Sequence, residues 1–178
     1  MAKAFFYGVF LQWKLDFRNK GVLLTYYVIP LVFFGFMGMI FTTINPLSKE
    51  TLIQSMCVFG VTMGAILGAP TPLVELYGSE IKKAYKVGGI PLWVPVINNF
   101  SSAFIHLLLM SMAICFTAPA AFHAKVPESM VVFMLLLMLF IIVSLAFGTA
   151  LGLLIKSVSK LTMLSQLIFL PSLMPVSY

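Results

Sequence analysis

The sequence predicts an all-α membrane protein, with an N-terminal helix at the membrane interface, five apolar spans and a cytoplasmic amino terminus. Of its 178 residues, 61% are hydrophobic and only 9% are charged, whereas soluble domains carry about 25% charged residues. The apolar residues form runs near the 20 or so that a helix needs to cross the hydrocarbon. This composition excludes a soluble enzyme, a disordered chain and a secreted disulfide scaffold. We expect one multi-pass domain over residues 1–178, located in the cell membrane.

Residues 3–20 predict an amphipathic helix lying in the interface. At 100° per residue four aromatic side chains share one face, and Lys14 lies off it: Phe6, Phe10, Trp13 and Phe17. A cytoplasmic extension of the first span is the alternative.

Five apolar runs follow. We expect spans at 22–42, 52–71, 96–118, 130–155 and 161–178. Pro30 predicts a kink in the first span. The last run would reach about 27 Å as a helix, so we expect its crossing to be incomplete.

Basic residues favour one orientation of these spans. Nine of the eleven fall before span 1, between spans 2 and 3, or between spans 4 and 5, and only Lys49 and Lys125 fall in the other loops. The positive-inside rule therefore places the amino terminus in the cytoplasm. This distribution accounts for the net charge of +6 as a topology signal with attraction to anionic lipid. We expect no nucleic acid partner.

Motifs for enzymatic chemistry are absent from the sequence. It contains no phosphate loop, HExxH or GxSxG, so we expect no catalytic residue and no bound metal. The two cysteines, Cys57 and Cys115, have no metal-binding spacing, and we interpret them as packing residues. All five carboxylates are expected at or beyond the ends of spans, which disfavours a proton-driven transporter: Asp16, Glu50, Glu75, Glu80 and Glu128.

Polar and small residues mark three helix faces. Asn99, Ser102 and His106 share one face of the third span. That face is either an interhelical hydrogen-bond stripe or the lining of a substrate path. Two faces of small residues predict close helix packing: Gly60, Gly64 and Gly68 in span 2, and Ser144, Gly148 and Gly152 in span 4.

The 73–95 segment is the longest polar stretch, and we expect it in the cytoplasm. Ser79 can cap a short helix over 79–87, with Glu80 in its first turn and three lysines behind, Lys82, Lys83 and Lys86. Gly88, Gly89 and Pro91 end it. Such a helix suits contact with another protein, although a solvated connector is the alternative.

At this segment the chain resembles the permease subunits of ABC-2 type ABC transporters. The resemblance rests on Glu75…Gly78-Ser79-Glu80-Ile81-Lys82-Lys83, on Ile90-Pro91-Leu92-Trp93 and on Leu164-Ser165-Gln166-Leu167-Ile168-Phe169-Leu170-Pro171. It implies a cytoplasmic interfacial helix, six spans, and a coupling helix between spans 2 and 3. The sixth span that the resemblance implies is missing from residues 1–178, so we expect a truncated reading frame or a fragment.

The resemblance also implies a function. The chain would be the non-enzymatic permease of an ATP-driven exporter, acting as a homo- or heterodimer with a separate ATP-binding subunit that holds ATP and magnesium. Glu75, Gly78, Ser79, Glu80, Lys82, Lys83, Lys86 and Pro91 would couple the two subunits. A stand-alone membrane binding or immunity protein and a secondary transporter are the alternatives.

Overall fold

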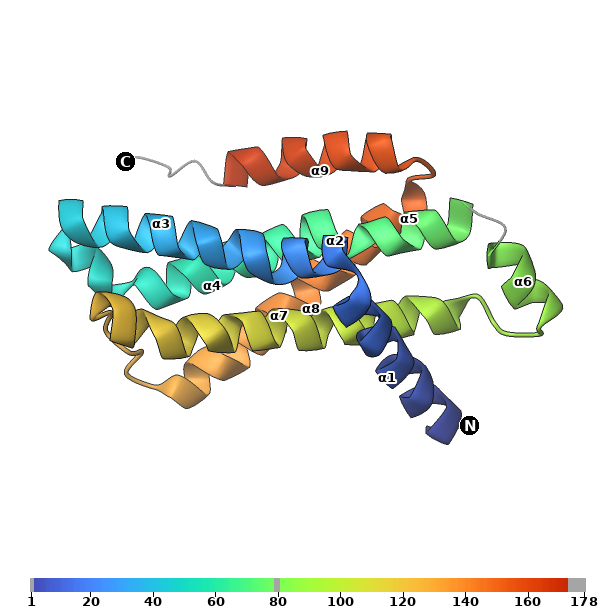
Figure 1. Cartoon of the computed structure of the whole chain (residues 1–178), viewed down its shortest axis with the longest axis horizontal. Coiled ribbons are helices and arrows are strands. Elements are labelled where there is room, and N and C mark those ends of the chain that lie inside the picture. The colour runs from blue at the N-terminus through green and yellow to red at the C-terminus, as the bar shows by residue number, and fades with distance from the viewer. Residues whose placement is uncertain (1, 79–80, 173–178) are drawn as a thin grey trace.

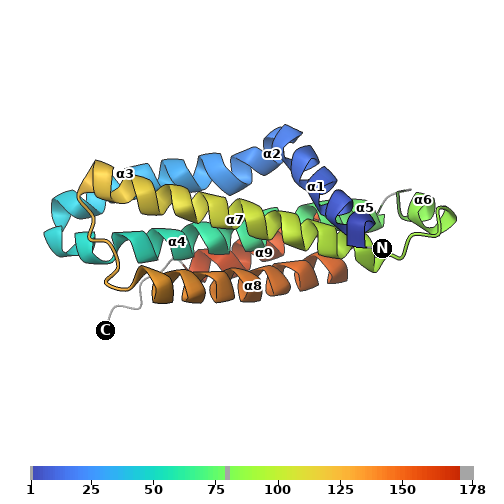
Figure 2. The same cartoon turned by 90° about the horizontal axis from the view of Figure 1, so that it is seen from below.

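The computed structural model describes residues 2–78 and 81–172, and within them every regular element is a helix. Four helices are long and apolar enough to cross a membrane: Lys20–Ile44, Leu52–Tyr77, Trp93–Phe122 and Met130–Leu154. They lie side by side along their lengths (Figures 1 and 2). The chain is therefore an all-helical, multi-pass membrane protein, as the composition predicts.

The first spanning helix follows a separate N-terminal helix. Helix α1 (Ala2–Arg18) ends at Asn19, whose side chain accepts a hydrogen bond from the Gly21 amide and so caps the next helix. That helix runs as α2 (Lys20–Leu23), the π-helical η1 (Leu24–Val28) and α3 (Ile29–Ile44). Figure 2 shows α1 leaving the bundle at an angle and crossing α7.

The second spanning helix extends beyond its expected end at residue 71. It comprises α4 (Leu52–Met63), the π-helical η3 (Gly64–Gly68) and α5 (Pro70–Gly78). Pro70 and Pro72 lack the amide hydrogens that α-helical bonding would require. The helix widens into a π turn just before them, with the Ala69 amide donating to the Gly64 carbonyl. Residues 73–78, expected to belong to the polar loop, are therefore helical.

The remaining helices differ from expectation mainly at their ends. Helix α7 (Trp93–Phe122) begins three residues early and continues past Pro119 to His123, whose left-handed backbone (φ 53°) ends it. Helix α8 (Met130–Leu154) lies within one residue of the expected span. The fifth apolar run forms α9 (Val158–Ser172), about 22 Å long and short of the roughly 30 Å core. Residues 173–178 lie outside the described part.

The core of the bundle lies between the second span, α7 and α8. Its fully buried side chains include Val61, Leu107, Ile114, Ile141 and Leu145. Helix α8 buries only a narrow strip and leaves Leu135, Leu136 and Leu139 exposed, as lipid-facing residues are. The end of the bundle where α3 leads into α4 is closed by the 3-10 turn η2 (Pro46–Glu50). There the Lys125 amide donates a hydrogen bond to the Lys49 carbonyl at 2.8 Å.

Candidate functional site

The segment that resembles a coupling helix lies at the far end of the bundle. Helix α6 (Ile81–Val87) projects beyond α5 and α7 (Figure 1) and carries Lys82, Lys83 and Lys86. It ends in a Schellman motif: Gly89 adopts φ +65°, and the Ile90 amide donates to the Tyr85 carbonyl at 3.0 Å. The glycine pair therefore stops the helix as the sequence predicts.

The other residues predicted for coupling lie around α6. Glu75 is exposed on α5, Gly78 is the last residue of α5, and Pro91 is exposed just before α7. Ser79 and Glu80, the expected cap and first-turn acid, lie outside the described residues. The described members of the predicted set therefore lie in one projecting loop or on the helix that leads into it, α5.

A hydrogen bond closes the base of this loop. The Tyr77 hydroxyl donates to the Leu92 carbonyl at 2.5 Å, which joins the end of α5 to the residue preceding α7. The Lys82 ammonium lies 5.8 Å from the centre of the Tyr77 ring, within range of a cation–π interaction. Tyr77 thus touches α6 and the start of α7 at once, which sequence reasoning did not reveal.

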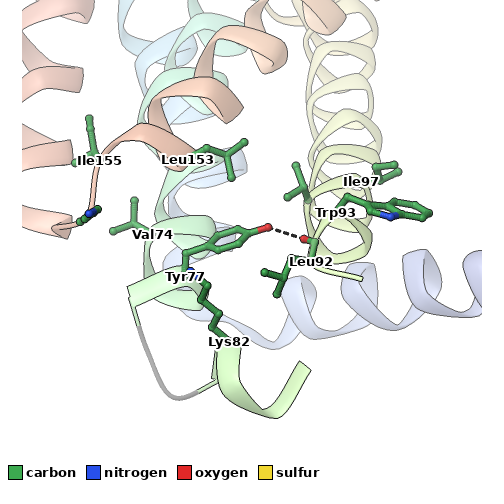
Figure 3. A pocket seen from close by; sticks show the side chains of 10 residues that line it. Val74, Tyr77, Lys82, Leu92, Trp93, Ile97, Leu153 and Ile155 are labelled. Carbon is green, nitrogen blue, oxygen red and sulfur yellow. Dashed lines mark hydrogen bonds between the residues drawn. The ribbon is translucent and has the colours of Figure 1, made fainter. Parts of the chain in front are cut away.

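A pocket of about 680 Å³ opens at the same end, between α5, α6, α7 and the end of α8 (Figure 3). Val74 and Tyr77 line it from α5, and Trp93 and Ile97 from α7. Its remaining walls come from Lys82, Leu92, Val96, Leu153, Ile155 and Lys156. The lining therefore combines apolar and aromatic side chains with two lysines.

A second cluster of polar side chains is buried where α1 crosses α7. The Ser102 hydroxyl donates to Asp16 Oδ2 at 2.6 Å, and the Gln12 amide donates to Asp16 Oδ1 at 2.9 Å. The two bonded oxygens fix the carboxyl group of Asp16, which is only 7% exposed. Burial raises the pKa of this carboxyl, and the two hydrogen bonds oppose the rise in part.

His106 completes this cluster from the next turn of α7. Its Nδ1 lies 2.8 Å from the Tyr27 hydroxyl, and its Nε2 lies 3.9 Å from Asp16 Oδ2 without a hydrogen-bond partner. The ring stacks on Tyr26 at 5.4 Å and contacts Phe17 at 5.1 Å. The pair Asp16–His106 is thus a buried, protonatable site shared by α1 and α7.

Asp16 differs from the sequence expectation. It precedes the first spanning helix in the sequence, but its carboxyl group is buried against Ser102 of α7. A signal was present: Gln12 and Asp16 are four residues apart on α1, as Ser102 and His106 are on α7. Residues four apart lie on the same face of a helix, so the two polar pairs can contact each other where α1 crosses α7.

The predicted polar face of α7 is directed into the chain itself. Ser102 and His106 meet α1 as described, while the Asn99 amide donates to the Ala69 carbonyl at 3.0 Å. All three side chains are at most 5% exposed. The face makes interhelical hydrogen bonds in this structure, which was one of its two interpretations.

The two small-residue faces also lie at close helix contacts. A Cβ at Gly60 or Gly64 would meet the flexible ends of Met110 and Leu107. At Gly148 a Cβ would overlap the backbone carbonyl oxygen of Ala65. A Cβ at Gly152 would lie 2.8 Å from the Pro70 carbonyl oxygen. Ser144, on the same helix, is half-buried. The α8 face therefore approaches backbone, whereas the glycine face of the second spanning helix (α4 and η3) approaches side chains.

No protein-family model, curated protein or solved structure matches the chain. Within residues 2–78 and 81–172, no three His, Cys, Asp or Glu side chains gather as metal ligands. The fold and its sites therefore rest on the chain's own geometry.

Proposed function

We propose that the chain is the membrane-spanning subunit of an ATP-driven ABC exporter, coupled to a separate ATP-binding subunit through α6. The observation that supports this most is the placement of a short basic helix beyond the bundle, at the end that the lysines and arginines assign to the cytoplasm. A partner can reach it there without entering the membrane.

The contacts of Tyr77 supply a route for coupling. Force applied to α6 by closure of the ATP-binding subunits would pass through Lys82 and Tyr77 to Leu92, and so to the start of α7. Helix α7 continues to Ser102 and His106, which hold α1. In this proposal α6 and α7 move together, and ATP and magnesium belong to the partner.

The experiment is co-purification of the protein from its own membranes, with photoreactive ATP marking any bound ATP-binding subunit. Lys83→Glu reverses one exposed charge on α6. Like charges facing each other across an interface cost several kcal/mol, so we expect recovery of the labelled subunit to fall at least tenfold. Lys125→Glu, exposed at the opposite end, is the matched control and should leave recovery unchanged. If the wild type retains no ATP-binding protein with or without nucleotide, the proposal fails.

Proton-coupled transport is a second candidate, and the buried Asp16–His106 pair favours it. The sequence argument against this class was that every carboxylate falls at or beyond the end of a span, and the burial of Asp16 against α7 weakens that argument. Infrared difference spectra between pH 5 and pH 8 should then contain a carboxylic acid band that Asp16→Asn abolishes. If the difference spectrum contains no carboxylic acid band that depends on Asp16, this residue is excluded as a proton carrier near neutral pH.

A further inference from the structure

The pocket beside α6 has the composition of a site for an anionic amphiphile. Of the ten residues in the described part of the chain that line it, two are lysines and none is acidic. The others are apolar or aromatic, so the site combines positive charge with an apolar surface. Its volume, about 680 Å³, lies within the range of about 300–1,000 Å³ typical of small-ligand pockets.

The pocket lies at the level where lipid headgroups are expected. Helix α8 has 25 residues, about 37 Å, which is enough to cross the hydrocarbon of about 30 Å. Lys156 follows its last residue by two positions, so its ammonium group falls at the membrane surface. Trp93 and Tyr77 are aromatic residues of the kind that gather at this level.

Helix α8 contributes an exposed apolar side chain to the pocket. Leu153 lines the pocket and is 47% exposed. The exposed apolar surface of α8 therefore runs into the pocket without a polar break at this residue. A ligand lying in the bilayer can enter from the side, with its chain still in hydrocarbon.

Lys82 is held in place for such a ligand. Its ammonium group lies over the Tyr77 ring, and the ring is fixed by the bond from its hydroxyl to the Leu92 carbonyl. A fixed charge loses less side-chain freedom on binding than a mobile one does.

We propose that this pocket binds the headgroup of an anionic phospholipid from the cytoplasmic leaflet. Lys82 and Lys156 neutralise the phosphate, and an acyl chain lies against Leu153 and Ile97. Basic pockets between spanning helices on the cytoplasmic side bind anionic headgroups in this way. The proposal goes beyond the export function and requires no ATP-binding subunit.

Native mass spectrometry of the protein in equimolar phosphatidylglycerol and phosphatidylcholine tests this. We expect one phosphatidylglycerol to be retained in preference to phosphatidylcholine. The double variant Lys82→Gln/Lys156→Gln should lower that preference roughly ten- to thirtyfold. The control Lys125→Gln/Lys160→Gln removes the same net charge outside the pocket and should retain it. Equal retention of the two lipids, or equal losses in both double variants, would overturn the proposal. Displacement of phosphatidylglycerol by millimolar inorganic phosphate would also overturn it, since the ligand would then be a free anion.

A second measurement does not depend on the lysine variants folding. Trp13→Phe leaves Trp93 as the only tryptophan in the sequence. Brominated phosphatidylglycerol should then quench Trp93 fluorescence at least twice as strongly as brominated phosphatidylcholine at equal mole fraction. Equal quenching by the two lipids would mean that Trp93 faces ordinary bulk lipid and that the site does not exist.

Discussion

Gly148→Ala should be among the most destabilising single-methyl additions in this chain. Its new methyl group would overlap the Ala65 carbonyl oxygen and lie 3.0 Å from the carbonyl carbon. Non-bonded carbons prefer about 3.5–4.0 Å, so α8 would have to move away by about 1 Å. Because the obstacle is backbone of the π turn η3, no side-chain rotation can relieve it.

The expected magnitude follows from that geometry. Overpacking a well-filled core typically costs about 1–3 kcal/mol, and an obstacle made of backbone places Gly148→Ala at or above the upper end. At about 2–4 °C per kcal/mol for a chain of this size, the melting temperature should fall by roughly 6–12 °C. The melting temperature of Gly152→Ala should fall less, because its added Cβ would lie 2.8 Å from the Pro70 carbonyl oxygen and so would overlap it less.

The assay is thermal unfolding in detergent at one fixed heating rate, because membrane proteins often unfold irreversibly. Gly35→Ala is the matched control: its Cβ meets nothing within 4 Å, and alanine favours helix over glycine. Its melting temperature should equal or exceed that of the wild type. If the melting temperature of Gly148→Ala equals that of Gly35→Ala, the close approach of α8 to η3 is refuted.

Three further predictions concern the ends of the bundle and the α1 contact. Because burial raises the pKa of the Asp16 carboxyl, the folded state holds this proton more tightly than the unfolded state. Its contribution to stability is therefore complete below the ordinary pKa of about 4 and is lost as pH rises through the folded-state pKa. The melting temperature of the wild type relative to Asp16→Asn should therefore rise as pH falls from neutral, and a constant difference would contradict the burial. Tyr77→Phe removes the donor to the Leu92 carbonyl and should cost about 1 kcal/mol, with faster trypsin cleavage after Lys83; an unchanged cleavage rate would show that the bond does not hold the loop. Reporters fused after Lys125 should be external and those after Lys83 internal, and an external Lys83 would reverse the assigned orientation.

Hydropathy was sufficient to predict the spanning helices, because each must satisfy its own backbone in lipid. Their ends were less predictable: the spans expected at 52–71 and 96–118 stop next to Pro72 and Pro119, but the helices continue past both prolines. In the structure the π turn η3 before Pro70 and a left-handed His123 after Pro119 relocate those ends. A proline removes one hydrogen bond, and the neighbouring backbone decides whether the helix continues.

The Asp16 cluster was beyond sequence reasoning for a different reason. Helical periodicity predicts which residues share a face, but not which distant helix that face meets. The aromatic stripe of α1 was assigned to the membrane, and Phe6 and Phe10 are indeed exposed. Trp13, which belongs to that stripe, stacks on His106 of α7 instead, and Asp16 bonds to Ser102 of the same helix. Their pairing depends on the crossing angle, which only the folded bundle sets.

The separation of the α1 and α7 partners has a consequence for how the protein is made. Asp16 and Ser102 are 86 residues apart, and a ribosome adding about 5–20 residues per second needs about 4–17 s to cover that distance. During this time the N-terminal helix can contact the first spanning helix through Phe17 and Tyr27, but its contacts to α7 cannot yet form. Its docking is thus a late step of biogenesis, and a nascent chain arrested before Trp93 should keep α1 open to a cytoplasmic protease.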